Sequence, residues 1–394
     1  MKKYRGAVAL SSFAFNSVPS IRFGAGIISN LRDIVVSANC SRVLLITDPG
    51  MLKTGIVSRA LGILEKGGIE VALFADVQAD PPEAVILAAT QAAIDHQAEG
   101  IIGLGGGSSL DVAKLVAVLA LQQETLQDIY GVGNIKGSRL PLTLIPTTAG
   151  TGSEVTMVSI VTTGASEKMG VVSPALLPDT AILDPELTLG LPPHITAATG
   201  IDAMVHAIEA YASVNANNNP LSKILAKEAL RLMGRAIETA VHDGSDIDAR
   251  SDMLLGSMLA GQAFANSPVA AVHALAYPIG GHYKVPHGLS NALVLPHVLK
   301  FNAVTSPQPY AEIAPLAFPE MQGMASQEAA AVFADKLAAL SARCGLQQNL
   351  REVGIERDAL PMFARDAMKQ TRLLVNNPRD LTEADALAIY EAAW

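Results

Sequence analysis

Strand-forming segments are confined to the first half of the chain, and this uneven distribution is the strongest constraint on the fold. Up to about residue 190, short runs rich in Val, Ile and Leu alternate with helical segments, whereas strand signals nearly vanish from Leu191 onward. The segment SRVLLITDPG contains the continuous apolar run VLLI, which is typical of a strand buried on both faces of a parallel sheet. The chain therefore predicts an α/β fold, with a doubly wound, parallel-sheet, Rossmann-like domain over residues 1–190 and an all-helical domain over residues 191–394.

The second half is expected to consist of helices joined by loops. The pattern predicts helices over residues 194–214, 220–242, 248–265, 268–276, 289–303, 326–344, 358–370 and 382–393. Residues that interrupt helices follow the fourth of these, namely Pro278, Gly280, Gly281 and Pro286. We therefore expect the chain to fold back on itself in this stretch.

Composition and charge exclude several classes of protein. A chain of 394 residues that is 50% hydrophobic and 16% charged can build a large, well-buried core. The net charge of −9, without a basic run, argues against nucleic acid or an anionic membrane surface as a partner. No uninterrupted apolar stretch reaches about 18 residues, so no membrane span is predicted.

Cysteine usage and the N-terminal residues indicate a cytoplasmic protein. The two cysteines, Cys40 and Cys344, lie far apart and outside any CxxC spacing, which fits a reducing compartment. The N-terminal segment MKKYRGAVALSSFAF faintly resembles a signal peptide, but Arg5 and two serines interrupt its apolar run and no clear cleavage site follows. We therefore expect no targeting signal.

A glycine-rich loop joins a predicted strand to a predicted helix. GIIGLG runs directly into GGGSSLD, and the helix is expected to begin near Ser109. Glycines let the backbone approach a pyrophosphate closely, and a helix N-terminus offers free N–H groups. The segment is either such a phosphate cradle or a tight strand–helix turn. The usual dinucleotide fingerprint places its acid after the glycines, whereas Asp48 precedes them, so a bound dinucleotide implies a different strand order.

Small and hydroxyl-bearing residues cluster after the next predicted strand. The segment LTLIPTTAGTGSEVT, residues 142–156, can wrap a ligand with hydroxyl and N–H donors, or it can form a packed turn. Val158–Thr163 and Gly170–Val172 then predict a hairpin that carries Lys168.

Four residues in the helical half form a candidate metal site. Asp202 and His206 are separated by four positions, so a helix presents both on one face. His273 and His287 flank the Gly- and Pro-rich stretch, which lets both imidazoles converge on one point. One carboxylate and three imidazoles suit Fe(II) or Zn(II). The alternative is that Asp202 caps a helix and the histidines are packed or solvated residues.

Taken in order, these motifs resemble those of the iron-containing (group III) alcohol dehydrogenase family, which is related in fold to glycerol dehydrogenase and dehydroquinate synthase. The resemblance covers nearly the whole chain and rests on the segments GGGSSLDVAK, PTTAGTGSEVT, DPELT, ATGIDAMVHAIEAY, HALAYPIGGHYKVPHGLSNALVLPHV and NNPRDLTEADALAIYEAAW. It implies a dehydroquinate synthase-like fold and a metal-dependent alcohol dehydrogenase or aldehyde reductase. Such an enzyme transfers a hydride between NAD(H) and a small primary alcohol, diol or aldehyde.

The resemblance also assigns residues to the cofactors. Asp202, His206, His273 and His287 match the family's metal ligands, with Fe(II) as the metal and Zn(II) as the alternative. The positions that match contacts to NAD are Asp80, Gly105, Gly106, Gly107, Ser108, Asp111, Thr147, Thr148, Thr151, Lys168 and Leu187. By resemblance and composition, a homodimer is expected, with small alcohols or aldehydes as the only other partners.

Asp48 predicts a preference between the two nicotinamide cofactors. It ends the first parallel strand and matches the position where an acid holds the adenosine ribose. A carboxylate there accepts hydrogen bonds from the 2′-hydroxyl and repels a 2′-phosphate, so we expect NAD(H) rather than NADP(H).

The sequence departs from the family pattern at Tyr277. Many members carry a second histidine there, which is thought to relay the substrate proton. A tyrosine has a reference pKa of about 10 and is a poorer proton shuttle near neutral pH. His282 is a candidate substitute, or else a loop histidine facing solvent. Phe264 and Leu373 match positions that line the pocket, although both could equally be core residues.

Other activities within the same fold remain as alternatives. Maleylacetate reductase is one, although its sequence near the third metal ligand usually carries paired histidines instead of VHALAYP. A hydroxyacid–oxoacid transhydrogenase is another, and Tyr277 does not exclude it. A dehydroquinate synthase-like lyase would need a cluster of Lys and Arg to hold a phosphorylated polyol, and none is evident. Net oxidation of NADH by aldehydes distinguishes the dehydrogenase from the transhydrogenase and the lyase.

Overall fold

A six-stranded sheet forms the centre of the first half of the chain in the computed structural model, which describes residues 12–164 and 167–394. All its pairings are parallel, in the order β1-β9-β6-β4-β2-β3. The strands are β1 (Ser20–Phe23), β2 (Arg42–Ile46), β3 (Glu70–Phe74), β4 (Gly100–Gly105), β6 (Leu142–Pro146) and β9 (Thr180–Leu183). The predicted α/β fold with a parallel sheet is confirmed.

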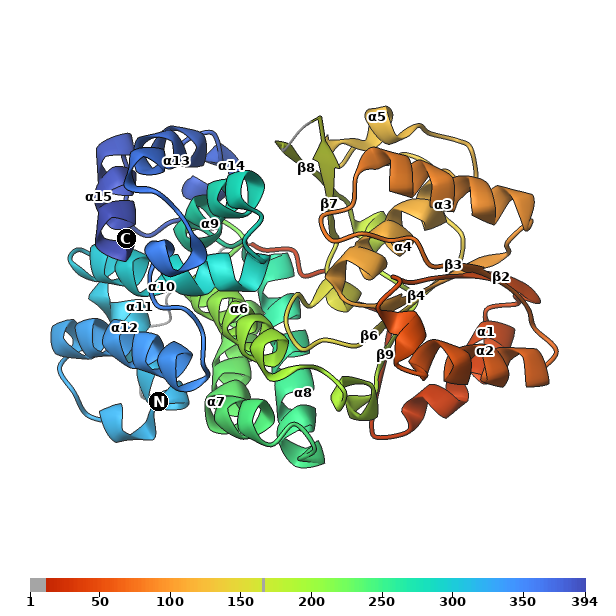
Figure 1. Ribbon diagram of the computed structural model, residues 1–394, viewed down its shortest axis with the longest axis horizontal. Helices are drawn as coiled ribbons and strands as arrows, with labels where there is room; N and C mark the ends of the chain where they lie inside the picture. The colour runs from red at the N-terminus through yellow and green to blue at the C-terminus, as the bar shows by residue number, and fades with distance from the viewer. Residues whose placement is uncertain (1–11, 165–166) are drawn as a thin grey trace, which may run out of the picture.

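Helices cover both faces of this sheet (Figure 1). They are α1 (Leu31–Ser37), α2 (Ile56–Lys66), α3 (Glu83–Asp95) and α4 (Gly107–Leu119), followed by the short α5 (Leu126–Ile129). Along β2, Val43 and Leu45 pack in the cluster under α1 and α2, whereas Leu44 and Ile46 pack in the cluster under α3 and α4. Since side chains alternate between the faces of a strand, burial on both faces explains why this strand is apolar throughout.

The order of the strands creates a crevice at one edge of the sheet. If β2, β3, β4, β6 and β9 are numbered 1 to 5 along the chain, they lie in the order 2-1-3-4-5 across the sheet. The chain therefore changes direction across the sheet between β2 and β4. In doubly wound sheets, ligands bind outside the carboxyl ends of the strands at this point. Asp48 follows β2 and the glycine-rich loop follows β4, so both lie at the crevice. The acid therefore precedes the glycines in sequence while lying beside them in space.

A second, smaller sheet stands beside the first. Its strands β5 (Gly131–Val132), β7 (Val158–Thr163) and β8 (Glu167–Val172) pair in the order β5-β8-β7. The predicted hairpin is confirmed, because β7 and β8 are antiparallel and Lys168 lies on β8.

Helices make up the second half of the chain, as predicted. The long ones are α6 (Pro193–Ala212), α7 (Pro220–His242), α8 (Ile247–Asn266), α9 (Ala271–Tyr283), α10 (His287–Ala303), α12 (Ser326–Arg343) and α15 (Glu383–Ala393). Helix α11 (Pro307–Ala317) is as long as α15, whereas α13 (Leu360–Ala367) and α14 (Thr371–Leu374) are shorter. Helix α11 was not predicted. Prolines in its first turn and at position 315 are typical of loops, although a proline at the first turn also fits a helix start.

The prediction that the chain breaks at Pro278 and the following glycines is wrong. Helix α9 continues through Pro278 to Tyr283. A proline inside a helix removes one backbone hydrogen bond, but residues on both sides of it, including Leu275 and Ile279, are fully buried in the largest core cluster. The chain turns instead at Lys284, whose φ is +57°, and α10 begins directly after Pro286.

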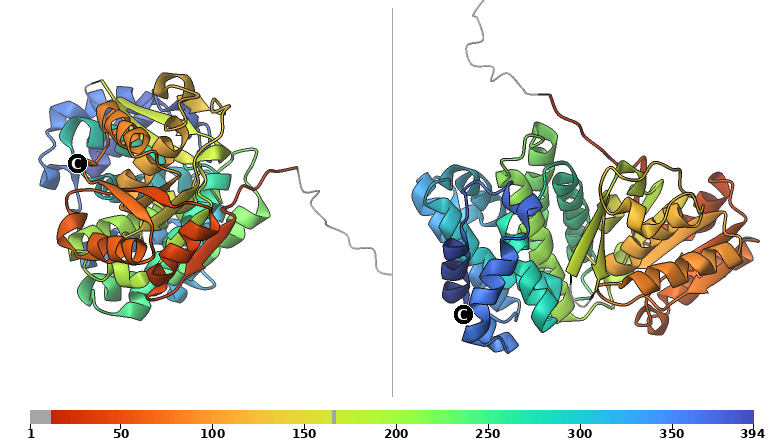
Figure 2. Two further views of the ribbon diagram at one scale, coloured as in Figure 1. Left: turned by 90° about the vertical axis from the view of Figure 1, so that its right-hand side faces the viewer. Right: turned by 90° about the horizontal axis from the view of Figure 1, so that it is seen from above.

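The two halves lie end to end along the long axis of the molecule (Figure 2). The segment before β1 contacts the helical half, since the amides of Ala14 and Asn16 donate to the side chains of Asn217 and Asn266. The division of the chain into domains at residue 190 stays a prediction. Within the described ranges, none of the helices combines the length and the apolarity needed to cross a bilayer. The expected absence of a targeting signal concerns mainly residues 1–11, which lie outside the described residues.

The loop after β6 packs against α8 so closely that only glycine fits. Gly152 has a φ of +59°, and a Cβ placed on it would lie 2.6 Å from the Cα of Gly261. The variant Gly152→Ala is therefore expected to lower the free energy of unfolding by about 2–4 kcal/mol, through backbone strain and overpacking. Urea unfolding of the metal-free protein measures this.

The matched control for that measurement is Gly62→Ala, inside α2. A Cβ on Gly62 meets nothing within 4 Å, so this variant should raise the stability by about 0.5–1 kcal/mol. Equal urea midpoints for Gly152→Ala and the unaltered protein would contradict the close packing of the loop on α8.

Candidate metal and cofactor site

A cavity of about 360 Å³ lies between the sheets of the first half and the helices of the second. Its wall includes the start of α4, the hairpin of β7 and β8, and residues from α6, α8, α9, α10 and α14. The residues on the wall that the sequence analysis singled out are Asp80, Gly107, Ser108, Asp111, Thr151, Lys168, Asp202, His206, Phe264, His273, Tyr277, His287 and Leu373. Predicted cofactor and metal positions thus face one space.

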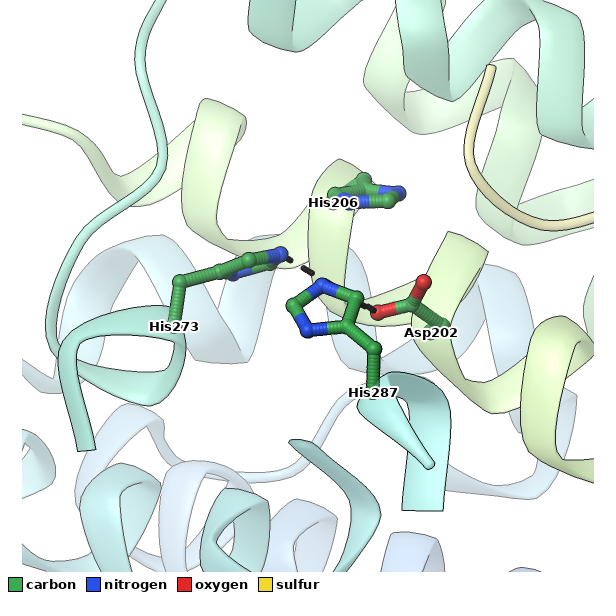
Figure 3. A group of neighbouring side chains, drawn as sticks. All are labelled: Asp202, His206, His273 and His287. Atoms are coloured by element: carbon green, nitrogen blue, oxygen red, sulfur yellow. Dashed lines mark ion pairs between the residues drawn. The ribbon is translucent and has the colours of Figure 1, made fainter. Parts of the chain in front are cut away.

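The structure brings the four candidate metal ligands together (Figure 3). Asp202 and His206 rise one turn apart from α6, His273 comes from the first turn of α9, and His287 is the first residue of α10. One ligand atom from each lies within 4.8 Å of the others. Three of the side chains are buried, and the side chain of His287 is 42% exposed.

The donor set fits a divalent transition metal. In a tetrahedral site with bonds of about 2.1 Å, any two ligand atoms lie about 3.4 Å apart, so the most distant pair needs to close by up to about 1.4 Å. Three of the lone pairs already converge on one hydrogen-bond donor, the side-chain amide of Asn291. Its Nδ2 lies 2.6 Å from Asp202 Oδ1, 3.4 Å from His273 Nε2 and 3.3 Å from His287 Nε2. Three nitrogens and one oxygen form the type of site that binds Fe(II) or Zn(II).

The protonation states of two ligands suit metal binding. Burial lowers the pKa of His206 to about 3, so this imidazole is neutral at physiological pH. Burial alone would raise the pKa of Asp202, but the three imidazoles and the Asn291 amide outweigh it and lower that pKa below its usual value. A metal requires neutral imidazoles and an ionised carboxylate.

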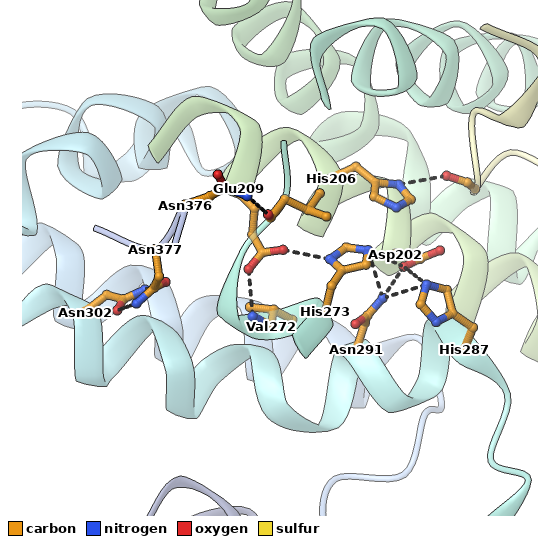
Figure 4. Close-up of polar contacts among 12 residues, drawn as sticks. Asp202, His206, Glu209, Val272, His273, His287, Asn291, Asn302, Asn376 and Asn377 are labelled. Atoms are coloured by element: carbon orange, nitrogen blue, oxygen red, sulfur yellow. Dashed lines mark hydrogen bonds and ion pairs between the residues drawn. The ribbon is translucent and has the colours of Figure 1, made fainter. Parts of the chain in front are cut away.

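A buried glutamate orients His273 (Figure 4). Glu209, on α6, accepts a hydrogen bond of 2.7 Å from His273 Nδ1 and another of 2.7 Å from the amide of Val272. Because a carboxylate only accepts, Nδ1 carries the proton and the lone pair of Nε2 points toward the other ligands. Carboxylate partners of this kind fix the ring orientation of metal-binding histidines and raise their basicity.

His206 is oriented from the other half of the molecule. Its Nδ1 donates to the backbone carbonyl of Gly150 at 3.2 Å. Gly150 belongs to the segment after β6, which also carries the predicted cofactor contacts Thr147, Thr148 and Thr151. This loop therefore touches both the metal side and the cofactor side of the cavity.

The glycine-rich loop has the features of a phosphate-binding turn. Gly105 ends β4 with a φ of +148°, and a Cβ there would lie 2.8 Å from Ser109 Oγ. Helix α4 begins at Gly107, two residues earlier than predicted, with Gly106 as its N-cap. The free N–H groups of this helix start lie beside the cavity, where they can bind an anion. A Cβ on Gly107 would lie 2.6 Å from Thr151 Cγ2, so the loop after β6 closes on the helix start.

Asp111 holds the walls of the cavity together. Its carboxylate accepts hydrogen bonds from Ser153 Oγ at 2.6 Å and from the amide of Ile160 at 3.0 Å. It also pairs with the fully buried Lys114, whose Nζ donates to the carbonyl of Val158 at 2.8 Å. Burial lowers the pKa of the Lys114 ammonium, and Asp111 partly offsets this. Helix α4 is thus tied to β7 and to the loop before it.

Asp48 lies next to the glycine-rich loop because β2 and β4 are neighbours in the sheet. Its Oδ1 accepts from the amides of Gly50 and Met51 at 2.9 and 3.2 Å, and its Oδ2 accepts from Ser109 Oγ at 3.4 Å. The carboxylate therefore shapes the turn after β2 with one oxygen, while the other faces α4.

The remaining cofactor positions fall into two groups. Asp80 and Lys168 form an ion pair of 2.7 Å on the cavity wall. The side chains of Thr147 and Leu187 are buried instead, the first against Met51 Sδ at 3.6 Å and the second in the core under α1 and α2. Their predicted contacts with NAD stay predictions.

The two candidate proton relays lie in different surroundings. Tyr277 lines the cavity and its ring is 6.0 Å from that of His287. Burial raises the pKa of the Tyr277 hydroxyl, and the charge of Arg372 partly offsets this. His282 pairs with Asp366 at 2.7 Å on the outer side of α9, away from the cavity wall. Tyr277 is therefore placed to donate a hydrogen bond in the cavity, and His282 is not.

Sequence reasoning missed Glu209 and Asn291. The helical spacing could have indicated both residues, because Glu209 lies three positions after His206 and Asn291 lies four positions after His287. Such spacings put residues on the same helix face. Polar residues that repeat on the ligand-bearing face of a buried helix are thus candidates for contacts to the ligands.

Two family models match nearly the whole chain. Residues 19–185 match the model described as iron-containing alcohol dehydrogenase. Residues 196–394 match the model described as the C-terminal part of the Fe-containing alcohol dehydrogenase family.

Individual relatives and solved structures agree with the models. Long-chain-alcohol dehydrogenase 1 of Geobacillus thermodenitrificans is 41% identical over 379 residues, covering 95% of each chain. The 1,3-propanediol dehydrogenase of Klebsiella pneumoniae is 36% identical and covers 96% of this chain and 98% of its own. A crystal structure of a 1,3-propanediol oxidoreductase superposes with a TM-score of 0.94 at 35% identity, covering 98% of this chain and all of the other.

Proposed function

Because the chain belongs to the iron-containing alcohol dehydrogenase family, we propose that it interconverts small primary alcohols or diols and their aldehydes with NAD(H) and Fe(II). Metal-dependent alcohol dehydrogenase or aldehyde reductase activity follows from the family and its relatives. The preference for NAD(H), the choice of Fe(II) over Zn(II), the homodimer and the cytoplasmic location are our proposals. So are the individual roles of the site residues.

One observation carries this proposal: four convergent ligands and a glycine-rich helix start face the same cavity. A bound metal would act as a Lewis acid on the substrate oxygen, and the nicotinamide would give or take the hydride. In this proposal the helix start of α4 binds the pyrophosphate and the Asp80–Lys168 pair contacts the nicotinamide end, which the free N–H groups of the helix and the 2.7 Å ion pair on the wall support. This arrangement holds two reactants in one enclosed space.

The chain's own residues set the rest of the chemistry. Tyr277 stays protonated near neutral pH because burial raises its pKa. We propose that its hydroxyl orients the substrate by donating a hydrogen bond instead of shuttling the proton. Phe264, which stacks on His206 with ring centroids 4.4 Å apart, and Leu373 give this part of the wall an apolar surface. Such a surface supports a short alkyl chain on the substrate.

An activity assay with defined metal tests the function. Protein purified without oxygen is loaded with Fe(II) or Zn(II), and NADH and NADPH oxidation is followed with aldehydes of two to six carbons. We expect about one metal per chain and net oxidation of NADH. A metal-loaded protein that exchanges hydride between a hydroxyacid and an oxoacid but oxidises no NADH would support the transhydrogenase alternative instead.

Glu209 gives a prediction for metal affinity. The variant Glu209→Gln keeps the shape and one acceptor oxygen but removes the charge that orients and polarises His273. Loss of such a partner typically weakens metal binding about 10–100-fold. Competition with a chromophoric chelator, without substrate or NADH, measures the metal dissociation constant directly.

The control is Glu312→Gln on α11, which removes a carboxylate that accepts from Tyr211 outside the cavity wall. It should leave the metal dissociation constant unchanged. Equal metal affinity for Glu209→Gln and Glu312→Gln would contradict the role of Glu209.

A further inference from the structure

Among the residues that the structure describes, one cation on the cavity wall has no oppositely charged neighbour. Arg372 lies on α14 and lines the cavity. Helix α14 stands on the side of the helical half that faces β8 (Figure 1). Its Nη2 lies 3.8 Å from the position that a Cβ on Gly170 would take, so the guanidinium rests against β8 from across the cavity. Lys168 lies two residues from Gly170 and therefore on the same face of that strand.

Every other charged group on the wall has a partner. Lys168 pairs with Asp80, and Asp111 pairs with Lys114 and accepts two further hydrogen bonds. Asp202 belongs to the metal ligands. Among residues 12–164 and 167–394, no carboxylate lies within ion-pair distance of Arg372 and no acceptor bonds to its guanidinium. Arg372 is exposed, lines the cavity and has no acceptor for its guanidinium among the described residues.

The surface near Arg372 is otherwise suited to a short carbon chain. Leu373, the next residue, is buried on the same wall, and Val269 and Phe264 line the wall beside it. A guanidinium binds carboxylate or sulfonate oxygens through two parallel hydrogen bonds.

We propose that Arg372 selects substrates whose aldehyde or alcohol group is joined by a short chain to a carboxylate or sulfonate. The reacting end lies at the metal ligands, and the anionic end pairs with Arg372. This inference rests on the proposed function, because it names the substrate class of the same site. The charge of Arg372 then determines substrate specificity, and neutral alkyl aldehydes are poorer substrates than anionic aldehydes of the same length.

Two four-carbon aldehydes that differ in one end group test the inference. Metal-loaded protein with saturating NADH is assayed with butanal and with 4-oxobutanoate, for the unaltered chain and for Arg372→Met. We expect kcat/KM for 4-oxobutanoate to exceed that for butanal in the unaltered chain. In Arg372→Met this ratio should fall about 10–100-fold, mainly through KM, which is the usual effect of losing a charged hydrogen-bonded pair. Arg372→Lys keeps the positive charge but cannot form two parallel hydrogen bonds, so its ratio should lie between those of the unaltered chain and Arg372→Met.

Arg365→Met on α13 is the matched control, because it removes an exposed arginine outside the cavity wall. It should leave the ratio unchanged. An unchanged ratio in Arg372→Met overturns the proposal. In a second series NADH is varied at a fixed concentration of each aldehyde. A rise in the KM for NADH with both aldehydes in Arg372→Met also overturns the proposal, because it would assign Arg372 to the cofactor's phosphates.

Failure of the proposed function has a different signature. If neither aldehyde is reduced, binding of 4-hydroxybutanoate and of 1-butanol to the metal-loaded protein with NAD is measured by calorimetry. Tighter binding of 4-hydroxybutanoate that is lost in Arg372→Met supports the role of Arg372 without turnover. Equal binding of the two alcohols overturns it.

Discussion

Replacing His273 with alanine is expected to remove the metal and to lower aldehyde reduction by NADH at least about 10³-fold. A metal that polarises a substrate oxygen contributes several kcal/mol of transition-state stabilisation, and each 1.36 kcal/mol is a factor of about ten. The variant leaves three ligands and deprives Glu209 of its 2.7 Å partner. Metal analysis by mass spectrometry and the NADH assay measure the two effects on the same sample.

The comparison variant is His282→Ala on the same helix. His282 is one-third exposed and pairs with Asp366 outside the cavity wall. It should keep its metal and most of its activity. A His273→Ala protein that retains one metal per chain would contradict the ligand set, and a large loss of activity in His282→Ala would return the proton relay to His282.

Replacing Asp48 with asparagine is expected to shift the ratio of kcat/KM for NADPH over NADH upward by about 10²-fold. A 2′-phosphate beside a carboxylate suffers repulsion of several kcal/mol, which the neutral amide removes. Asparagine keeps an oxygen that can accept from the amides of Gly50 and Met51, so the turn after β2 is retained. Steady-state kinetics with both cofactors and one aldehyde measure the ratio.

The matched control is Asp33→Asn, which removes an exposed carboxylate on α1 that pairs with the neighbouring Arg32. The ratio of kcat/KM for NADPH over NADH should be the same in Asp33→Asn as in the unaltered chain. Asp48→Gly removes the charge together with the acceptor for the turn, so a shift in Asp48→Gly but not in Asp48→Asn would point to the shape of the turn. No shift in either variant would contradict the cofactor preference.

The alternation of strands and helices was visible in the sequence because burial leaves a strong pattern. Strand β2 is apolar at every position after Arg42, since neighbouring residues face helices on opposite sides of the sheet. The location of Asp48 next to the glycines was less direct. It follows from the strand order, which depends on pairings between distant segments.

Local sequence patterns gave wrong predictions where burial in the tertiary structure outweighed them. Pro278 and two glycines predict a break, but the core around Leu275 and Ile279 keeps α9 helical until Lys284. Glu209 and Asn291 were missed for a related reason. Each looks like an ordinary polar residue on a helix, and only the fold brings it within hydrogen-bond distance of ligands that lie 64 and 89 positions away in sequence.

The site is divided between two stretches of sequence that do not overlap. All four candidate metal ligands follow residue 200, and the glycine-rich loop, Asp48 and the Asp80–Lys168 pair precede residue 170. Gly150 reaches the metal side through its backbone carbonyl, which no side-chain substitution deletes. Metal preference and nucleotide preference can therefore change independently during evolution or engineering, and recombining the two halves of related chains becomes a route to new pairings of metal and cofactor.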